Sequence, residues 1–226
     1  MSVRRGPHLS LEQLAPYLLV TSSERTVSED ESASSSPFDW RGIFGNDHPV
    51  ELEVGFGKGL FLVTAAQTHP EINFVGVEVV RKYQLFTATR LAKRGLGNVR
   101  VACADVRLFL PRYVAAESLQ AVHVYFPDPW WKKRHHKRRV FTTEFVTECV
   151  RALRPGRQLH AVSDVEEYAA VMTNLLNEQH SLQALPPPSE KEPLHDLDYL
   201  TNFERKFRKQ GKPIFRMRYE RKSLGA

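Results

Sequence analysis

Between residues 50 and 180, short apolar runs rich in β-branched side chains alternate with longer segments whose apolar residues recur at helical spacing. The short runs predict strands at 50–54, 73–79, 99–103, 119–126 and 158–163, and a further run predicts a strand at 212–221. The longer segments predict helices at 60–68, 80–94, 106–113, 140–153 and 165–178. Alternation of strand and helix is typical of an α/β fold, so we expect a mostly parallel sheet with helices on both faces.

The pattern changes on either side of this core. Residues 9–18 have apolar positions close to helical spacing and predict a short helix. Residues 21–37, TSSERTVSEDESASSSP, hold too few large apolar side chains to offset the entropy of ordering, which predicts a flexible linker. We therefore expect an N-terminal extension over 1–37 and one folded domain over 38–226. Three consecutive prolines make 181–197 a loop or an edge-strand connection.

The overall composition, 42% hydrophobic and 26% charged, is that of a globular domain. No apolar run approaches the roughly 20 residues that span a bilayer, and the N-terminus has no apolar segment of a secretory signal. The two cysteines, Cys103 and Cys149, lack the spacing of metal ligands and predict free thiols in a reducing compartment. These features argue against a membrane protein and favour a cytoplasmic one.

The net charge of +6 is unevenly distributed. Residues 132–139 hold six lysines and arginines and residues 205–222 hold nine, so these two segments contain 15 of the 32 basic residues. One charged run is usually a solvated face. Two dense runs with interleaved aromatic residues favour the binding of a polyanion such as RNA.

A glycine-rich turn follows the first predicted strand of the core, in the sequence ELEVGFGKG at 51–59. Gly55 and Gly57 permit positive φ and a close approach of the backbone to a ligand, at the edge where open parallel sheets bind ligands. The G-x-G-x-G spacing differs from the G-x-G-x-x-G of pyrophosphate-binding dehydrogenases. Alone, the turn is weak evidence, because a plain tight turn has the same pattern.

Three acidic residues lie at the ends of the first three predicted strands of the core: Glu53, Glu78 and Asp105. Glu53 would attract the amino-acid end of a cationic cofactor, Glu78 stands where a carboxylate binds ribose hydroxyls, and Asp105 could accept a hydrogen bond from an adenine amino group. Each acid alone could be a helix N-cap or a solvated side chain. Together they fit S-adenosylmethionine, which has a ribose, an adenine and a sulfonium cation but no phosphate.

The most specific segment is YFPDPWWKKRHHKRR at 125–139, directly after the fourth predicted strand. Two prolines fix the backbone on both sides of Asp128 and hold one carboxylate at the carboxyl edge of the sheet, beside the predicted methyl donor. Trp130 or Trp131 could stack on a base of the substrate, or could simply pack beneath the loop. The cationic residues that follow are spaced to contact phosphates.

This segment resembles the signature of the bacterial-type tRNA (guanine-N7)-methyltransferases. Ser163-Asp164 before the helix EEYAAVM, and TNFE at 201–204 before a basic C-terminal strand, resemble further elements of that family. The similarity runs from about residue 50 to residue 220 and leaves 1–37 outside. It implies a Rossmann-like class I S-adenosylmethionine-dependent methyltransferase with a mostly parallel seven-stranded sheet, so that 38–226 would be a methyltransferase domain acting on tRNA.

The resemblance also implies the roles of single residues, with Asp128 as the catalytic carboxylate. The donor would be contacted by Glu53, Gly55, Gly57, Glu78, Asp105 and Asp128; the target nucleotide by Lys132, Asp164, Thr201, Asn202, Phe203 and Glu204; and the RNA backbone by Arg134, His135, His136, Lys137, Arg138 and Arg139. Trp131 stands at a position that varies in the family and receives no role.

The implied reaction makes chemical sense of these residues, because guanine N7 carries an in-plane lone pair and attacks the sulfonium methyl group without prior deprotonation. The protein must align N7 with the methyl–sulfur bond and stabilise the charge that moves onto the purine, which Asp128, Asp164 or Glu204 could do. Two alternatives stay open. One is a non-catalytic RNA-binding protein, which would have no use for the cofactor acids, and the other is a methyltransferase for another RNA or base.

Other chemistry is disfavoured. His135 and His136 are flanked by cations that would repel a metal ion, so no metal site is expected. Neither cysteine has a neighbouring histidine or a glycine elbow that would activate it as a nucleophile. The sequence leaves open whether the protein is a monomer or a homodimer.

Overall fold

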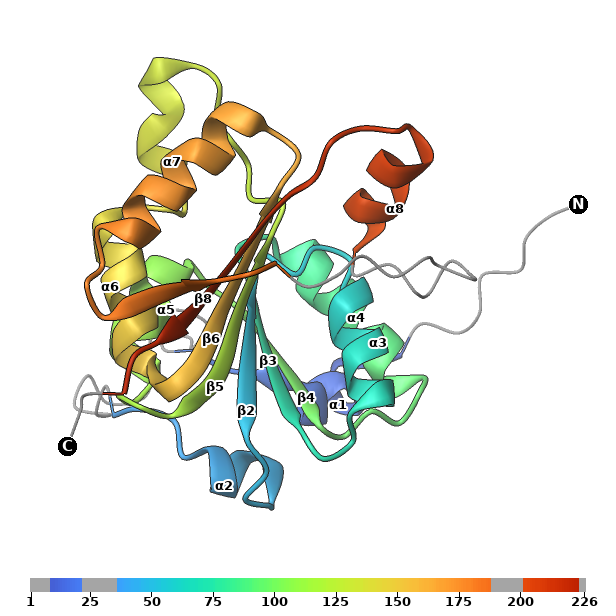
Figure 1. The fold of residues 1–226 in the computed structure, drawn as a ribbon. Coiled ribbons are helices and arrows are strands. Elements are labelled where there is room, and N and C mark those ends of the chain that lie inside the picture. The colour runs from blue at the N-terminus through green and yellow to red at the C-terminus, as the bar shows by residue number, and fades with distance from the viewer. Residues whose placement is uncertain (1–8, 22–35, 188–200, 224–226) are drawn as a thin grey trace, which may run out of the picture.

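The computed structural model describes residues 9–21, 36–187 and 201–223, which form a twisted sheet between two layers of helices (Figure 1). The strands are β1 Leu18–Leu19, β2 Val50–Val54, β3 Asn73–Glu78, β4 Val99–Cys103, β5 Leu119–Tyr125, β6 Leu153–Ser163, β7 Leu182–Leu185 and β8 Phe215–Arg221. They make one eight-stranded sheet in the order β1-β4-β3-β2-β5-β6-β8-β7. The first six strands are parallel, and β8 is antiparallel to β6 and β7. The α/β class is confirmed, and the predicted count of seven strands is corrected to eight within the described residues.

The helices are α1 Leu11–Leu14, α2 Trp40–Phe44, α3 Leu60–Thr68, α4 Arg81–Ala92, α5 Val106–Tyr113, α6 Thr143–Ala152, α7 Glu166–Asn177 and α8 Asn202–Lys209, with the 3-10 helices η1 Ala15–Tyr17 and η3 Lys133–Arg138. Figure 1 shows α5, α6 and α7 on one face of the sheet and α3, α4 and α8 on the other, as expected. Within the described ranges, none of the helices has the length and apolar character needed to cross a bilayer.

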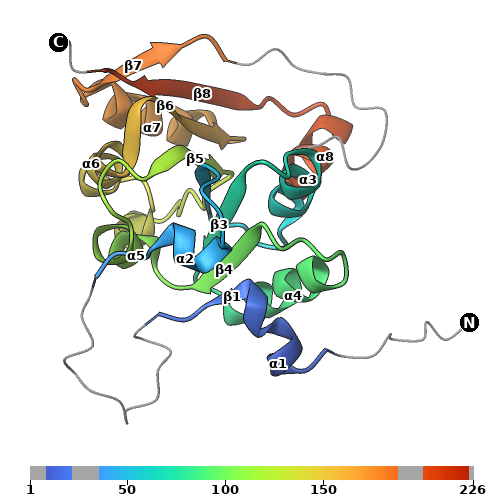
Figure 2. The same cartoon turned by 90° about the horizontal axis from the view of Figure 1, so that it is seen from below.

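Part of the N-terminal extension packs at the edge of the sheet (Figure 2). Ser10 caps α1, Leu14 and Leu19 are buried, and β1 pairs in parallel with β4. The helix predicted over 9–18 is thus present only as a short α-helix and a 3-10 turn, because the chain then extends to join the sheet. Residues 22–35 of the predicted linker lie outside the described residues, and the domain boundary at residue 38 stays a prediction.

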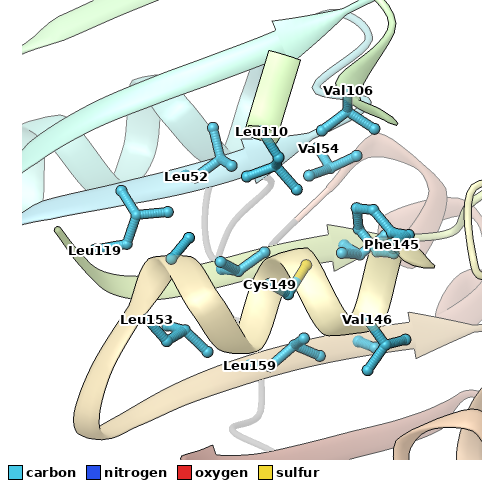
Figure 3. Packing of buried hydrophobic residues seen from close by; sticks show 14 of the residues in the cluster. Leu52, Val54, Val106, Leu110, Leu119, Phe145, Val146, Cys149, Leu153 and Leu159 are labelled. Atoms are coloured by element: carbon cyan, nitrogen blue, oxygen red, sulfur yellow. The ribbon is translucent and has the colours of Figure 1, made fainter. Parts of the chain in front are cut away.

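The core occupies both faces of the central strands. On one face, Leu52 of β2, Leu110 of α5 and Cys149 of α6 belong to a cluster of fully buried side chains, which Figure 3 shows at close range. A second cluster lies beneath α3 and α4. Both cysteines are free, and burial raises the pKa of the Cys149 thiol, so this side chain serves packing and is a poor nucleophile.

The strand order decides where a ligand can bind. In chain order the sheet grows from β2 through β3 to β4 on one side, and through β5 to β6 on the other. Loops that leave the carboxyl ends of β2 and its neighbours therefore turn apart, and a crevice opens between them at this edge. The glycine turn after β2 and the Pro-Asp-Pro loop after β5 both start at this crevice.

Candidate functional site

A pocket of about 830 Å³ lies at the carboxyl ends of β2, β3 and β5, and its volume suits a small-molecule ligand or cofactor. The glycine turn, the start of α5, the Pro-Asp-Pro loop and α8 all contribute to its walls. Nine of the residues predicted from the sequence line it: Glu53, Gly55, Gly57, Glu78, Asp105, Asp128, Arg138, Thr201 and Phe203. Predicted donor residues and predicted substrate residues, far apart in the chain, thus share one pocket.

The glycine turn has the backbone conformation that the sequence predicts. Gly55 and Gly57 have φ angles of 73° and 50°, which favour glycine over any residue with a side chain. A Cβ on either glycine would meet no described atom within 4 Å. The turn therefore leaves open space beside its backbone, where a closely approaching cofactor would fit.

Both oxygens of the Glu78 carboxylate are fixed by backbone donors. The N–H of Gly57 donates to Oε2 over 3.1 Å, and the N–H of Val80 donates to Oε1 over 3.0 Å. Since a carboxylate oxygen has two lone pairs, each oxygen can accept one more hydrogen bond. Glu78 lines the pocket, so these free acceptor sites are available to hydroxyl groups of a ligand.

Glu53 is buried, with 3% of its surface exposed, and its Oε2 has no hydrogen-bond partner among the described residues. Burial, with a further contribution from the negative charge of Glu78, raises the pKa of Glu53 well above its usual value. A buried acid with an unpaired oxygen is unfavourable, and a cation beside it would relieve both the missing bond and the repulsion. This unpaired oxygen fits the ammonium group of S-adenosylmethionine.

Asp105 caps α5, because its Oδ1 accepts a hydrogen bond from the backbone N–H of Arg107 over 3.0 Å. The Arg107 guanidinium also binds both carboxylate oxygens, and its Nη2 lies 2.5 Å from Oδ2. These hydrogen bonds from Arg107 hold the pKa of Asp105 below its usual value. We did not predict Arg107 from the sequence, although a position two residues after a helix N-cap brings the two side chains together.

The Pro-Asp-Pro loop lies between two aromatic residues with positive φ, Phe126 at 52° and Trp130 at 45°. Bulky residues rarely adopt this conformation, which costs about 1–3 kcal/mol each and is concentrated at functional sites. Arg139 stabilises the loop by donating a hydrogen bond from Nε to the carbonyl of Pro129 over 2.7 Å. Asp128 is exposed at the tip of this constrained loop and faces the pocket.

The predicted RNA-binding residues lie on and beside η3. Arg134, His136, Lys137 and Arg138 are exposed, and His135 and Arg139 are half-buried. The Arg138 guanidinium lies 5.0 Å from the centre of the Trp130 ring, and that of Arg139 lies 4.8 Å from the centre of the Tyr168 ring. Trp130 lines the pocket, whereas Trp131 is 65% exposed. Trp130 is therefore the tryptophan that a ligand in the pocket can meet.

Three predicted substrate residues do not line the pocket: Lys132, Asp164 and Glu204. Lys132 is exposed and Asp164 is half-buried. Glu204 is buried, and its Oε1 lies 2.7 Å from Arg216 Nη2. Thr201 caps α8, because its Oγ1 accepts a hydrogen bond from the backbone N–H of Glu204 over 3.0 Å. Asn202 begins α8, and its side chain lies outside the described residues.

A buried polar chain near the pocket was not predicted. His123 of β5 contacts Glu51 Oε2 through Nε2 and the Tyr125 hydroxyl through Nδ1, both over 2.8 Å. Burial raises the pKa of Tyr125 well above its usual value, and Glu53, Glu51 and Glu204 add to this shift. The signal in the sequence is the spacing of His123 and Tyr125, since alternate residues of a strand share one face.

No group of three or more His, Cys, Asp or Glu side chains with the proximity of metal ligands occurs within residues 9–21, 36–187 and 201–223. His135 instead packs edge-on against Trp130, with ring centres 5.8 Å apart.

Sequence comparisons identify relatives over most of the chain. A family model described as "Putative methyltransferase" matches residues 47–217. The tRNA (guanine-N(7)-)-methyltransferase of Rhodopirellula baltica is 40% identical over 225 residues, which cover 97% of this chain and 82% of that protein. The protein of the same name from Hydrogenovibrio crunogenus is 35% identical over 183 residues, which cover 81% of this chain and 76% of that protein.

Comparison with solved structures supports the fold. The 16S rRNA methyltransferase KamB gives a TM-score of 0.60 at 15% identity and covers 88% of this chain and 97% of that one. A SAM-dependent O-methyltransferase from Thermotoga maritima gives a TM-score of 0.52 at 13% identity, and the match covers 84% of this chain and 69% of that one. The fold is thus the Rossmann-like fold of S-adenosylmethionine-dependent methyltransferases. The sequence relatives are more specific, and with them the chain belongs to the family of tRNA (guanine-N(7)-)-methyltransferases.

Proposed function

We propose that this protein transfers the methyl group of S-adenosylmethionine to N7 of a guanosine in the variable loop of tRNA and so forms 7-methylguanosine. One observation carries the proposal: a single pocket joins three acids suited to the donor, a rigidly held Asp128 and cationic side chains. Membership of the family supports the same reaction.

The acids of the pocket match separate parts of the donor. Glu78 would accept hydrogen bonds from the ribose, Asp105 from the adenine amino group, and Glu53 would bind the ammonium group. The two neighbouring buried carboxyl groups, Glu53 and Glu78, favour a cationic ligand over a phosphate. S-adenosylmethionine supplies a methyl group bonded to a positively charged sulfur.

Asp128 is proposed to act on the acceptor. Guanine N7 attacks with its own lone pair, so no base is needed, and positive charge develops on the purine as the methyl group is transferred. A carboxylate held in place before the reaction stabilises that charge without reorganising. The strained residues on either side of the loop, Phe126 and Trp130, are consistent with such preorganisation.

The remaining predicted residues are proposed to bind the RNA. Arg138 lines the pocket from the end of η3, and Arg205 and Lys206 line it from α8, so a nucleotide in the pocket would have cations on two sides. Thr201 and Phe203 are proposed to contact the target nucleotide, as are Asp164 and Lys132 from beside the pocket. Arg134, His136 and Lys137, which are exposed, and the half-buried His135 are proposed to contact phosphates. The enzyme is proposed to be cytoplasmic and to be a monomer or a homodimer.

The proposal is tested by methyl transfer to unmodified total tRNA, followed by mass spectrometry of the nucleosides. We expect 7-methylguanosine, and sequencing of the modified tRNA to place it in the variable loop. A different methylated nucleoside would support a methyltransferase for another base. Binding of tRNA without binding of S-adenosylmethionine would support a non-catalytic RNA-binding protein.

A further inference from the structure

Arg107 connects two parts of the site that the proposed function treats separately. Its guanidinium binds both oxygens of Asp105, which is proposed to bind the adenine of the donor. Its Nη1 donates a hydrogen bond over 3.1 Å to the carbonyl of Lys137, in the last turn of η3. One side chain therefore joins the donor site to residues 132–139, the basic segment that is proposed to bind RNA.

The contact with Asp105 leaves room for the donor. The carboxylate has four lone-pair sites, of which two can serve the guanidinium and one serves the backbone N–H of Arg107. A site remains for the adenine amino group. Asp105 stays ionised, because the hydrogen bonds from Arg107 lower its pKa, and its orientation is fixed before the donor arrives.

The contact with Lys137 supplies a partner for a carbonyl near the end of a helix. The last carbonyls of a helix lack partners within it and are bonded by side chains or water. Arg107 satisfies one of them from α5, and Arg139, two residues after Lys137, donates a hydrogen bond to the carbonyl of Pro129. Two side-chain hydrogen bonds thus hold the C-terminal end of η3, and one of them comes from Arg107, which also binds Asp105 of the donor site.

An exposed ion pair alone would add little, and the side chains of Arg107 and Asp105 are 43% and 33% exposed. What distinguishes Arg107 is the planar arrangement of its donors. A guanidinium can bind a carboxylate with two parallel hydrogen bonds and still donate to a third group, which a lysine ammonium at the same place cannot match. The planar geometry of the guanidinium, more than its charge, allows Arg107 to bind Asp105 and the carbonyl of Lys137 at the same time.

We propose that Arg107 is a positioning residue that couples the donor site to the RNA-binding segment. A donor bound to Asp105 holds Arg107, and through Lys137 it holds residues 133–138 in the arrangement that tRNA requires. The inference rests on the proposed function, because it assumes that both ligands bind to this pocket and segment. Coupling between two sites is reciprocal, so tRNA must tighten donor binding by the same factor as the donor tightens tRNA binding.

The first test measures the dissociation constant of S-adenosylhomocysteine, by calorimetry, with and without saturating tRNA transcript. In the wild type we expect tRNA to lower this constant about fivefold or more. Arg107→Ala should reduce the factor to less than about twofold. Arg107→Lys keeps the charge but lacks the planar guanidinium, so we expect this variant also to lose most of the coupling. Arg112→Ala, on the same helix and exposed, is the matched control and should couple like the wild type.

The second test needs no ligand. Hydrogen–deuterium exchange should increase in residues 132–139 of free Arg107→Ala and stay at the wild-type level in Arg112→Ala. Unfolding temperatures of the variants close to that of the wild type will show that the exchange is local. Unchanged exchange in Arg107→Ala would overturn the positioning role. Full coupling of Arg107→Lys in the first test would overturn the role of the guanidinium geometry.

The two proposals can fail separately. A wild-type protein that binds both ligands without coupling would overturn this inference and leave the proposed function standing. A protein that binds neither ligand would overturn the proposed function and the inference with it.

Discussion

The backbone N–H of Gly57 donates a hydrogen bond to Oε2 of Glu78 over 3.1 Å and so joins the glycine turn after β2 to the end of β3. The two residues are 21 positions apart, yet they form one preorganised unit because their strands are adjacent and parallel. Preorganisation lowers the entropy that a ligand loses on binding. The acid left without this support is Glu53, whose Oε2 is unpaired among the described residues.

We expect donor binding to release a proton from Glu53. Burial and the charge of Glu78 raise its pKa in the free protein, and an ammonium group beside it would lower that pKa again. Affinity for S-adenosylhomocysteine should therefore increase with pH until free Glu53 is ionised, and then level off. Calorimetry between pH 5 and 8, in buffers with different ionisation enthalpies, measures both effects. Glu53→Gln should bind more weakly and lose this dependence, and a Glu53→Gln profile equal to the wild type would rule out the linkage.

Asp128→Asn should lower the rate of methyl transfer about 100-fold or more, because it removes the charge aimed at the developing cation and keeps the shape of the side chain. Asp128 is exposed, so we expect an unchanged unfolding temperature. Single-turnover methylation measures the rate, and filter binding should show that tRNA still binds. A fully active Asp128→Asn would remove the carboxylate from the chemistry.

Much of the donor site could be predicted from the sequence, for a topological reason. The bounds of β2, α3, β4 and α5 match the prediction, because turn and capping residues mark their ends, such as Gly59 before α3 and Asp105 before α5. Acids at the ends of parallel strands must then meet at one edge of the sheet, so Glu53, Glu78 and Asp105 converge whatever the details of packing.

The remaining features depend on tertiary contacts. β1 has two residues, and only its pairing with β4 makes it a strand. The TNFE motif suggests one binding unit, but its carboxylate, Glu204, is buried against Arg216 and Arg208 while Phe203 reaches the pocket. The bond from Arg107 to Lys137 spans 30 residues and depends on a side-chain rotamer that no pattern of residue types encodes.

Trp130→Ala and Trp131→Ala should separate the two roles proposed for tryptophan. Trp130 lines the pocket, so its loss should raise the KM for tRNA about tenfold, within the range of about 1–3 kcal/mol for one stacked base. Trp131 is 65% exposed and should be replaceable with little change in KM. Steady-state methylation of tRNA by the two variants makes the comparison. An equal change in the KM for tRNA in both variants would contradict the proposal that Trp130, and not Trp131, stacks on a base in the pocket.

The basic segment should divide into residues that bind phosphate and one that supports the loop. Arg134→Ala and Lys137→Ala should each reduce the salt dependence of tRNA binding by about one phosphate contact. The pair Arg138→Ala and Arg139→Ala should weaken binding and flatten the dependence further. Arg139→Ala alone should also slow methyl transfer at saturating tRNA, because it removes the hydrogen bond to Pro129. Filter binding across salt concentrations and single-turnover rates test this, and an unaltered salt slope would contradict the phosphate contacts.

Glu51→Gln should destabilise the protein in a manner that depends on pH. The Glu51 carboxylate lies 2.8 Å from His123 Nε2, and the two side chains are 14% and 8% exposed. Burial raises the pKa of Glu51, but the hydrogen bond and charge of His123 outweigh it, so the pKa lies below its usual value. An acid with a lowered folded-state pKa stabilises the protein above its unfolded pKa, and this stabilisation is lost as the pH falls through the folded value.

At pH 7 we therefore expect Glu51→Gln to lower the free energy of unfolding by about 1–3 kcal/mol, and the difference to shrink as the pH falls below about 4. Urea unfolding at pH 7 and at about pH 3 measures it. The matched control is Glu71→Gln, which breaks an exposed pair with His69 at 3.1 Å, whose side chains are 64% and 51% exposed. Solvent screens that pair, so its loss should leave the free energy of unfolding close to that of the wild type at both pH values. A deficit in Glu51→Gln that is the same at pH 7 and at about pH 3 would mean that the ionised form of Glu51 is not what stabilises the fold.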